Sequence, residues 1–290
     1  MKNKLLFYLP SLIVFIGTFI LFSYHISSSY GLAYDFGRDA MWMYDILHGR
    51  LTLLGPKLSF GGYYLGPYYY YLFSHFLLLT RYYPDGALIF NAFLFSISAT
   101  LIFIILKKNT NTWFSLIPTL WIVFNSYFLF SARNPGNAFT YVSFLTLYIT
   151  YILFYKIESR LITFLLGIIS GLIANFHPVS LLVLIPATII QLLTKKQKVA
   201  IKAKAIIIYL LGIIIMYIPL IIFEVRHGFI MFTNTFIAGS LNVFTNSLNQ
   251  VSQVVPSKNP FMNFFILNNL IGFWIIPSLL TLQILIFLYL

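Results

Sequence analysis

Long apolar runs, separated by short polar connections, constrain this chain more than any other feature of its sequence. The runs cover residues 5–24, 85–106, 113–131, 137–155, 161–176, 179–193, 205–223 and 266–289. A helix needs about 20 apolar residues to cross a hydrocarbon core roughly 30 Å thick, so the longer runs fit transmembrane helices. Because 60% of the residues are hydrophobic and only 8% are charged, against about 25% charged in soluble domains, the sequence predicts an all-α polytopic membrane protein.

The lysines indicate how these runs cross the membrane. Loops that stay in the cytoplasm carry an excess of Lys and Arg. With a cytoplasmic N-terminus, eight crossings place every lysine cluster on the cytoplasmic side, which predicts a multi-pass protein of the plasma membrane. The residues placed there are Lys2, Lys4, Lys107, Lys108, Lys156, Arg160, Lys195, Lys196, Lys198, Lys202 and Lys204.

Two long segments then lie on the extracytoplasmic side. Outer loop 1 covers residues 25–84 and outer loop 2 covers about 224–265. Residues 67–81 have a helical pattern, but counting them as a crossing would move the lysines outside. We therefore expect a juxtamembrane helix there, with its tyrosines at the level of the lipid headgroups. The chain reads as one transmembrane domain, 1–290, and its last apolar run ends without flanking charge, so we expect the protein to continue further.

Outer loop 1 concentrates charge in a chain that has little. Three of the six acidic residues lie there within eleven positions: Asp35, Asp39 and Asp45. Asp35 can cap a helix running from about Phe36 to Leu47, which Gly49 would end. Asp35 and Asp39 then lie about one turn apart, beside Arg38. This face is either a capped, solvated helix surface or a catalytic one, in which Asp35 or Asp39 acts as a general base towards an acceptor hydroxyl.

The basic residues on the predicted outer face are mostly arginines: Arg38, Arg50, Arg81, Arg133 and Arg226. The planar fork of Arg binds phosphate and carboxylate groups at two points, whereas Lys is a point charge. The sequence therefore predicts an anionic ligand on this face. Arg133 is alternatively a snorkelling residue at the membrane interface.

Other candidate residues also have two interpretations. Glu224, Arg226 and His227 open outer loop 2 and either anchor a helix end at the interface or bind a phosphate. His177 either marks the bend before Pro178 or contacts substrate. Six tyrosines form either an interfacial aromatic belt or a sugar-stacking platform, in which Tyr63, Tyr64 and Tyr68 would bind substrate: Tyr63, Tyr64 and Tyr68–Tyr71. No metal site is expected, but three carboxylates supply oxygen atoms of the kind that bind a divalent cation: Asp35, Asp39 and Glu224.

Asp35-x-x-Arg38, followed by Gly49 and by the aromatic segment from Tyr63 to Tyr70, resembles the first outer loop of the lipid-dependent glycosyltransferases of the C fold (GT-C). That group includes protein O-mannosyltransferases and aminoarabinose transferases. Its loop carries an acidic Asp-Glu-x-Arg-type motif and later a Lys-Pro-Pro-Leu-Tyr-Tyr-type segment, and its functional outer loops lie between spans one and two and between spans seven and eight. The sequence departs from this pattern at Phe36, which replaces the second acid, and at Leu65-Gly66, which replace an acid and a lysine.

The resemblance implies a GT-C-like bundle of about eight transmembrane helices, with juxtamembrane helices in outer loop 1. It implies an inverting membrane glycosyltransferase in which Asp35 is the catalytic base and Arg38 the orienting cation, with Asp39 as a second acid. The sugar donor would be a polyprenyl phosphate and the acceptor a hydroxyl or amine of a glycan, lipid or protein. Because the family's lysine is missing, the phosphate would be bound by Arg226, Arg133 or Lys57.

Two other functions are compatible with this sequence. An oligosaccharide polymerase or ligase also has large outer loops. A lipid or sugar transporter needs ionisable residues at mid-membrane depth, and the apolar runs hold almost none in their centres. Nucleic acid is not an expected partner, because the basic residues are placed as topology signals.

Overall fold

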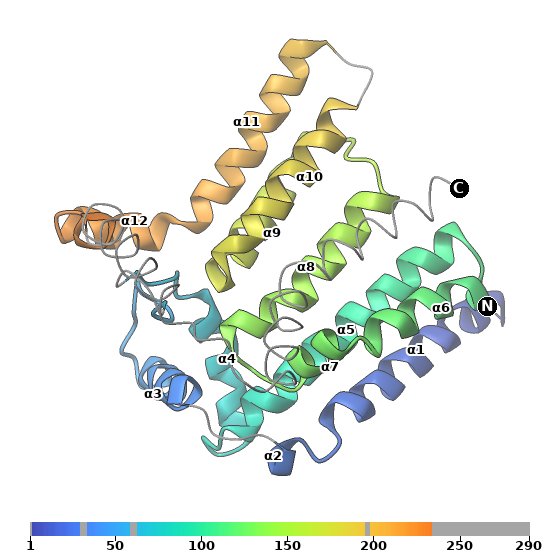
Figure 1. The fold of residues 1–290 in the computed structure, drawn as a ribbon, viewed down its shortest axis with the longest axis horizontal. Helices are drawn as coiled ribbons and strands as arrows, with labels where there is room; N and C mark the ends of the chain where they lie inside the picture. Colours follow the sequence, from blue (N-terminus) through green and yellow to red (C-terminus); the bar gives the residue numbers. More distant parts are fainter. Residues whose placement is uncertain (1, 30–33, 59–62, 195–197, 234–290) are drawn as a thin grey trace, which may run out of the picture. The chain divides into compact units, whose positions relative to one another are not determined.

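The computed structural model describes residues 2–29, 34–58, 63–194 and 198–233 (Figure 1). Residues 1–231 form one compact unit, and only Phe232 and Thr233 of the second unit, 232–290, are described. The predicted last span and most of outer loop 2 therefore lie outside the described residues. Apart from one isolated bridge between Lys57 and Tyr64, every regular element in the described ranges is helical.

The helices are α1 (Lys2–Ser23), α2 (Ile26–Ser29), α3 (Tyr34–Leu47), α4 (Tyr68–Leu79), α5 (Asp85–Asn109), α6 (Thr112–Val123), α7 (Ser126–Ala132), α8 (Asn137–Phe154), α9 (Arg160–Phe176), the 3-10 turn η1 (Pro178–Ser180), α10 (Leu181–Leu193), α11 (Val199–Met216), α12 (Ile218–Arg226) and α13 (Ile230–Phe232).

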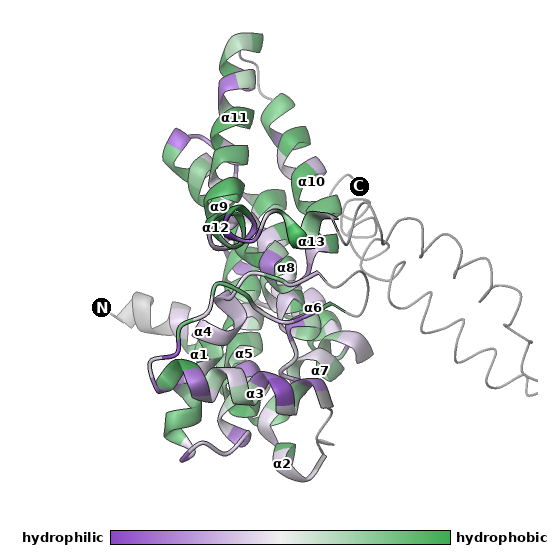
Figure 2. Ribbon diagram, turned by 90° about the vertical axis from the view of Figure 1, so that its left-hand side faces the viewer, coloured by the Kyte–Doolittle hydropathy of each residue, from purple (hydrophilic) through white to green (hydrophobic). Residues whose placement is uncertain are grey.

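Four stretches of helix are long and apolar enough to cross a membrane: Tyr8–Ser28, α5, α8 and α11. A fifth is obtained if α6 and α7, which meet at 70°, form one span. Helices α9 and α10 are also apolar, but shorter. Figure 2 shows the apolar character of α5, α9 and α11 against the hydrophilic α3. The prediction of an all-α protein with several membrane-spanning helices is confirmed, and the count of eight spans stays a prediction.

The connections between the long helices alternate between two ends of the bundle (Figure 1). The start of α1, the α5–α6 and α8–α9 connections, the end of α10 and the start of α11 lie at one end, which we call the lysine end. It carries Lys107 and Lys108 at the end of α5, Lys156 after α8 and Lys198 before α11. Helices α2 to α4, the α7–α8 turn, the α9–α10 corner and α12 lie at the opposite end, the loop-1 end.

Two predicted spans are each split into two helices, which corrects the sequence prediction. The run 113–131 breaks because the side chain of Asn125 accepts hydrogen bonds from the backbone N–H groups of Tyr127 and Phe128, and so starts α7 anew. The run 205–223 breaks at Tyr217, where Pro219 opens α12. The predicted break at residues 175–178 is confirmed, since α9 ends at Phe176 and Pro178 opens the next turn.

Helices α9 and α11 pack closely because glycines face each other between them. A Cβ atom on Gly167 would overlap the carbonyl oxygen of Tyr209, and one on Gly212 would overlap that of Phe164. The hydroxyl of Tyr209 donates a hydrogen bond of 2.8 Å to Ser170 across the same interface. Small residues and interhelical hydrogen bonds are the usual means of helix association in membranes.

Candidate active site at the loop-1 end

Helix α3 carries the acidic cluster that the sequence singles out. It spans Tyr34–Leu47 and ends before Gly49, whose φ of +85° lies in the left-handed region that favours glycine. The predicted end of this helix is confirmed. Its start is corrected, because Asp35 lies within the first turn and does not precede the helix. A negative charge in a first turn is stabilised by the unpaired N–H groups there.

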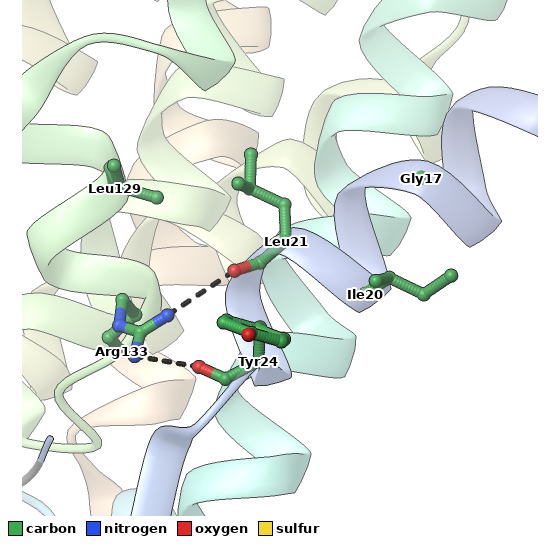
Figure 3. Close-up of a pocket in the computed structure, with 6 residues that line it drawn as sticks. All are labelled: Gly17, Ile20, Leu21, Tyr24, Leu129 and Arg133. Atoms are coloured by element: carbon green, nitrogen blue, oxygen red, sulfur yellow. Dashed lines mark hydrogen bonds between the residues drawn. The ribbon is translucent and has the colours of Figure 1, made fainter. Parts of the chain in front are cut away.

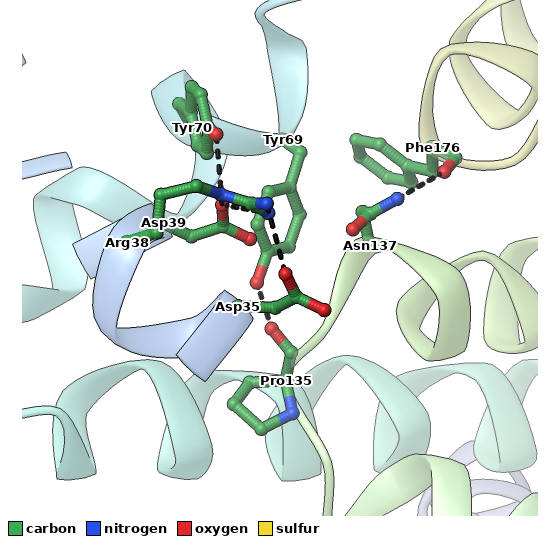
Figure 4. Close-up of polar contacts among 8 residues, drawn as sticks. All are labelled: Asp35, Arg38, Asp39, Tyr69, Tyr70, Pro135, Asn137 and Phe176. Atoms are coloured by element: carbon green, nitrogen blue, oxygen red, sulfur yellow. Dashed lines mark hydrogen bonds and ion pairs between the residues drawn. The ribbon is translucent and has the colours of Figure 1, made fainter. Parts of the chain in front are cut away.

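Arg38 joins the two acids that share its face of the helix (Figure 4). Its Nη1 lies 2.9 Å from Oδ1 of Asp35, and its Nη2 lies 2.8 Å from Oδ1 of Asp39. Its Nε donates a further hydrogen bond of 2.9 Å to the same oxygen of Asp39. The planar guanidinium therefore fixes both carboxylates relative to each other.

The two acids differ in burial. The side chain of Asp39 is 2% exposed, and its Oδ1 also accepts a hydrogen bond of 2.9 Å from the hydroxyl of Tyr70. Burial raises the pKa of Asp39, although Arg38 and the Tyr70 hydroxyl oppose the shift. The side chain of Asp35 is 77% exposed. Asp39 therefore anchors Arg38 inside the protein, and Asp35 is the carboxylate that a ligand in solvent can reach.

Part of the tyrosine run at the start of α4 lies inside the protein, and its place at the level of the lipid headgroups stays a prediction. Tyr69 and Tyr70 are buried. The hydroxyl of Tyr69 donates to the carbonyl of Pro135, in the α7–α8 turn (Figure 4). The hydroxyl of Tyr71 donates a hydrogen bond to the carbonyl of Thr52 and accepts one from the N–H group of Thr52. Each of these hydroxyls thus has a partner within the protein, as the polar group of a buried or half-buried tyrosine usually does.

The α7–α8 turn that receives Tyr69 is held by a polar residue of α5. The side-chain amide of Asn91 donates to the carbonyls of Ser131, Ala132 and Asn134, at 2.8, 3.0 and 3.2 Å. Sequence reasoning missed Asn91. The sequence did contain a signal for this residue. A polar side chain within an apolar membrane run costs free energy and is therefore usually functional or hydrogen-bonded to a partner.

The two Gly-Pro steps of outer loop 1 lie against each other. The N–H of Gly55 donates to the carbonyl of Leu65 at 2.7 Å, and the N–H of Leu65 donates to the carbonyl of Pro56 at 2.9 Å. A Cβ on Gly55 would overlap the carbonyl of Gly66, and one on Gly66 would overlap the side chain of Asn175. The paired segments 55–58 and 63–66, which we call the hairpin, therefore lie against the end of α9.

The hairpin also brings predicted site residues towards α12. Burial raises the pKa of Tyr63, and the charge of Glu224 raises it further, so Glu224 lies within electrostatic range of this tyrosine. Glu224 accepts a hydrogen bond of 3.1 Å from the backbone N–H of Met231. The Tyr64 ring lies 5.9 Å from Nζ of Lys57, and burial raises the pKa of the half-buried Tyr68.

The other predicted ligands are placed apart from the acidic pair. Arg226 and His227 are exposed at the end of α12, where the His227 ring stacks on Phe223 at 4.0 Å. The guanidinium of Arg133 points to the end of α1. The His177 ring stacks on Tyr141 at 4.6 Å, and burial lowers its pKa.

The structure thus unites Asp35, Arg38 and Asp39, and brings Tyr63 within electrostatic range of Glu224. Within the described ranges, no hydrogen bond or ion pair connects Asp35 with Arg226. No group of three or more His, Asp or Glu residues close enough to hold a metal ion occurs among the residues described, so Asp35, Asp39 and Glu224 do not form the cation site considered from the sequence.

Sequence reasoning named Tyr69 and Tyr70 as part of an aromatic belt or sugar-stacking platform, but it missed their contacts with Pro135 and Asp39. The spacing of Tyr69, Phe73 and Leu77, each four residues apart and all buried, was a signal for the inward face of α4. No local signal pairs Tyr70 with Asp39.

Comparison of the chain with protein-family models, with curated proteins and with solved structures finds no match.

Proposed function

We propose that this protein is a membrane glycosyltransferase, which transfers a sugar from a polyprenyl phosphate to an acceptor hydroxyl or amine on the extracytoplasmic face. The observation that carries the proposal is the geometry of Asp35. Its carboxylate is exposed, yet it is oriented by Arg38, which is itself anchored by the buried Asp39. An exposed acid held in one orientation is what general-base catalysis needs.

The chemistry assigned to Asp35 is a direct displacement. Its carboxylate removes the proton of the acceptor hydroxyl, and the acceptor oxygen attacks the anomeric carbon from the face opposite the phosphate. The bond between that carbon and the phosphate oxygen breaks, and its electron pair leaves with the polyprenyl phosphate. The anomeric configuration is therefore inverted. One carboxylate is sufficient, since phosphate leaves as a stable anion once a cation neutralises its charge.

The cation assigned to the donor phosphate is Arg226. Arg38 already binds two carboxylates, and the described hydrogen bonds of Arg133 go to the end of α1. Arg226 ends α12 at the loop-1 end, and the charge of Glu224 on the same helix raises the pKa of Tyr63 in outer loop 1. Glu224 and His227, on either side of Arg226, are assigned to position it.

The arrangement of the bundle supports the sidedness in this proposal. Lysine residues mark one end, and the acidic helix α3 lies at the other (Figure 1). By the positive-inside rule the lysine end is cytoplasmic, and the loop-1 end faces outside, where lipid-linked sugars are the available donors. We further propose that the described helices belong to a bundle of eight spans of the GT-C type.

The test uses membrane vesicles that contain the full chain, a synthetic polyprenyl-phosphate monosaccharide and cell-envelope acceptors. Replacing Asp35 with Asn should lower sugar transfer at least about 100-fold, the lower range for loss of a general base. Asp45→Asn is the matched control, because Asp45 lies on the same helix, pairs only loosely with Arg50 at 3.4 Å and has no assigned role. Full activity of the Asp35→Asn protein would refute the assignment.

A further inference from the structure

One oxygen of Asp39 receives hydrogen bonds from two helices. The Nε and Nη2 atoms of Arg38, on α3, lie 2.9 and 2.8 Å from Oδ1 of Asp39, and the hydroxyl of Tyr70, on α4, donates to the same oxygen at 2.9 Å (Figure 4). The neighbours of Tyr70 on α4, Tyr69 and Tyr71, donate to backbone carbonyls instead. The mechanism proposed above uses Arg38 and Asp39 and gives Tyr70 no part.

The partners of Arg38 differ from those of Arg133 in how firmly the backbone holds them. Arg133 donates to the backbone carbonyls of Leu21 and Tyr24 at 3.3 and 2.9 Å, and these acceptors belong to the end of α1 (Figure 3). Arg38 binds two side-chain carboxylates, whose terminal torsions have broad energy wells. The position of the Arg38 guanidinium therefore depends on what orients these carboxylates.

Tyr70 orients the inner one of the two. The side chain of Asp39 is 2% exposed and that of Asp35 is 77% exposed, so Asp39 is the acid that the protein can hold in place. Tyr70 is itself buried, and its ring stacks on that of Trp42 on α3, with the two planes 12° apart. The hydroxyl therefore meets Asp39 at one defined position.

The hydrogen bond from Tyr70 also favours the charged form of Asp39. Burial and the charge of Asp39 raise the pKa of Tyr70, so its hydroxyl stays protonated and donates. Burial raises the pKa of Asp39, Arg38 and the Tyr70 hydroxyl lower it, and the charge of Asp35 raises it. Without the hydroxyl, Asp39 would take up a proton more readily. A neutral Asp39 holds Arg38 less firmly, because the charge-assisted part of their contact is lost.

We propose that Tyr70 is a positioning residue for sugar transfer: its hydroxyl orients Asp39, which fixes Arg38, and Arg38 in turn orients the catalytic carboxylate of Asp35. This role rests on the proposed glycosyltransferase function and adds helix α4 to the groups that serve it. Because Tyr70 acts through Asp39, its hydroxyl contributes to the rate only while Asp39 is present and charged.

The test uses the vesicle assay with a synthetic polyprenyl-phosphate monosaccharide. Tyr70→Phe removes the hydroxyl and keeps the ring that stacks on Trp42. It should lower kcat about tenfold and leave KM for the donor unchanged, since this is the range for loss of a hydrogen bond to a charged group. The fall of kcat at low pH should begin at a higher pH than in the natural protein, because Asp39 loses a donor that favours its charged form.

Tyr209→Phe is the matched control. It also removes one hydroxyl from a buried tyrosine, and that hydroxyl donates to Ser170 at 2.8 Å, between α11 and α9. Both variants should lower the thermal unfolding midpoint to a similar extent. Tyr209→Phe should keep the kcat and the pH profile of the natural protein, so a loss seen only in Tyr70→Phe is not a consequence of lower stability.

A double variant tests the route through Asp39. Combining Tyr70→Phe with Asp39→Asn should give the same kcat as Asp39→Asn, and losses that add would overturn the route. If Asp35→Asn is inactive while Tyr70→Phe keeps the natural kcat and pH profile, the role of Tyr70 is overturned and the proposed function stands. Full activity of Asp35→Asn, or no transfer by the natural protein, would refute the proposed function and this role together.

Discussion

Asp35 and Asp39 lie one helical turn apart and contact the same arginine, but one of the two carboxylates is exposed and the other is buried. Tyr70 and the core around α4 bury Asp39, whereas the first turn of α3 leaves Asp35 in solvent. Removing water from a carboxylate disfavours its charged form, and hydrogen bonds to that form favour it. In Asp39 the first effect is larger, and its pKa is raised.

The raised pKa of Asp39 predicts a pH dependence of stability. The folded protein binds this proton more tightly than the unfolded chain does, so the contribution is fully present below about pH 4, the ordinary value for Asp. It is lost as the pH rises through the raised pKa. The thermal unfolding midpoint of the natural protein should therefore fall, relative to that of Asp39→Asn, as the pH rises above about 4. A difference between the two midpoints that stays constant or grows with pH would contradict this account.

At the scale of elements, helix breaks and close contacts decide where polar groups lie. Asn125 starts α7, Pro178 opens the corner after α9, and Pro219 opens α12. Each break ends one helix and begins another, and so exposes the unpaired backbone groups of a helix end. The glycine contact between α9 and α11 then fixes Asn175, on which Gly66 of the hairpin is seated.

The α9–α11 contact yields a prediction with an internal control. Gly167→Ala introduces a methyl group where the Tyr209 carbonyl lies, so it should lower the free energy of unfolding by about 1–3 kcal/mol, as overpacked contacts do. Gly17→Ala adds the same group in open space and should leave stability equal or slightly higher, since Ala favours helix more than Gly does. Unfolding in mixed micelles measures both. Equal effects of the two variants would show that α9 and α11 are not in close contact.

At the scale of the whole molecule, the helix connections within residues 1–231 carry different charged residues at the two ends of the bundle. Lysines gather where α5, α8 and α10 lead into the next helix, and the acidic helix, the hairpin and the arginine of α12 gather at the opposite end. The positive-inside rule converts this separation into a prediction of sidedness.

The sidedness can be mapped by labelling single introduced cysteines, because the chain has no cysteine of its own that would also react. Single cysteines at the exposed Thr110 and Glu158, at the lysine end, should react with a membrane-impermeant maleimide only from the cytoplasm. Cysteines at the exposed Leu51 and Tyr83, at the loop-1 end, should react only from outside. Labelling of residues from the same end on opposite sides would refute the threading of the helices.

Sequence reasoning reached the helical class, the helix that ends before Gly49, the break before Pro178 and the grouping of Asp35 with Arg38. These features depend on residues close together in the chain, through helical spacing, turn chemistry and hydropathy. It interpreted the tyrosine run as an interfacial belt or a sugar-stacking platform, and Arg133 as a phosphate ligand or a snorkelling residue, without foreseeing the contacts that these residues make within the protein. Those outcomes depend on partners such as Pro135, Asp39 and Leu21, which are distant in sequence.

By itself the sequence determined that this chain forms apolar helices with charge held at their ends, because charge and backbone polar groups are costly within hydrocarbon. Only the tertiary structure decided which of two similar acids is buried, which arginine caps a helix and which glycines lie in a close helix contact. Burial and hydrogen-bond partners belong to the folded neighbourhood of a residue, and that neighbourhood is assembled from segments as far apart as α1 and α7.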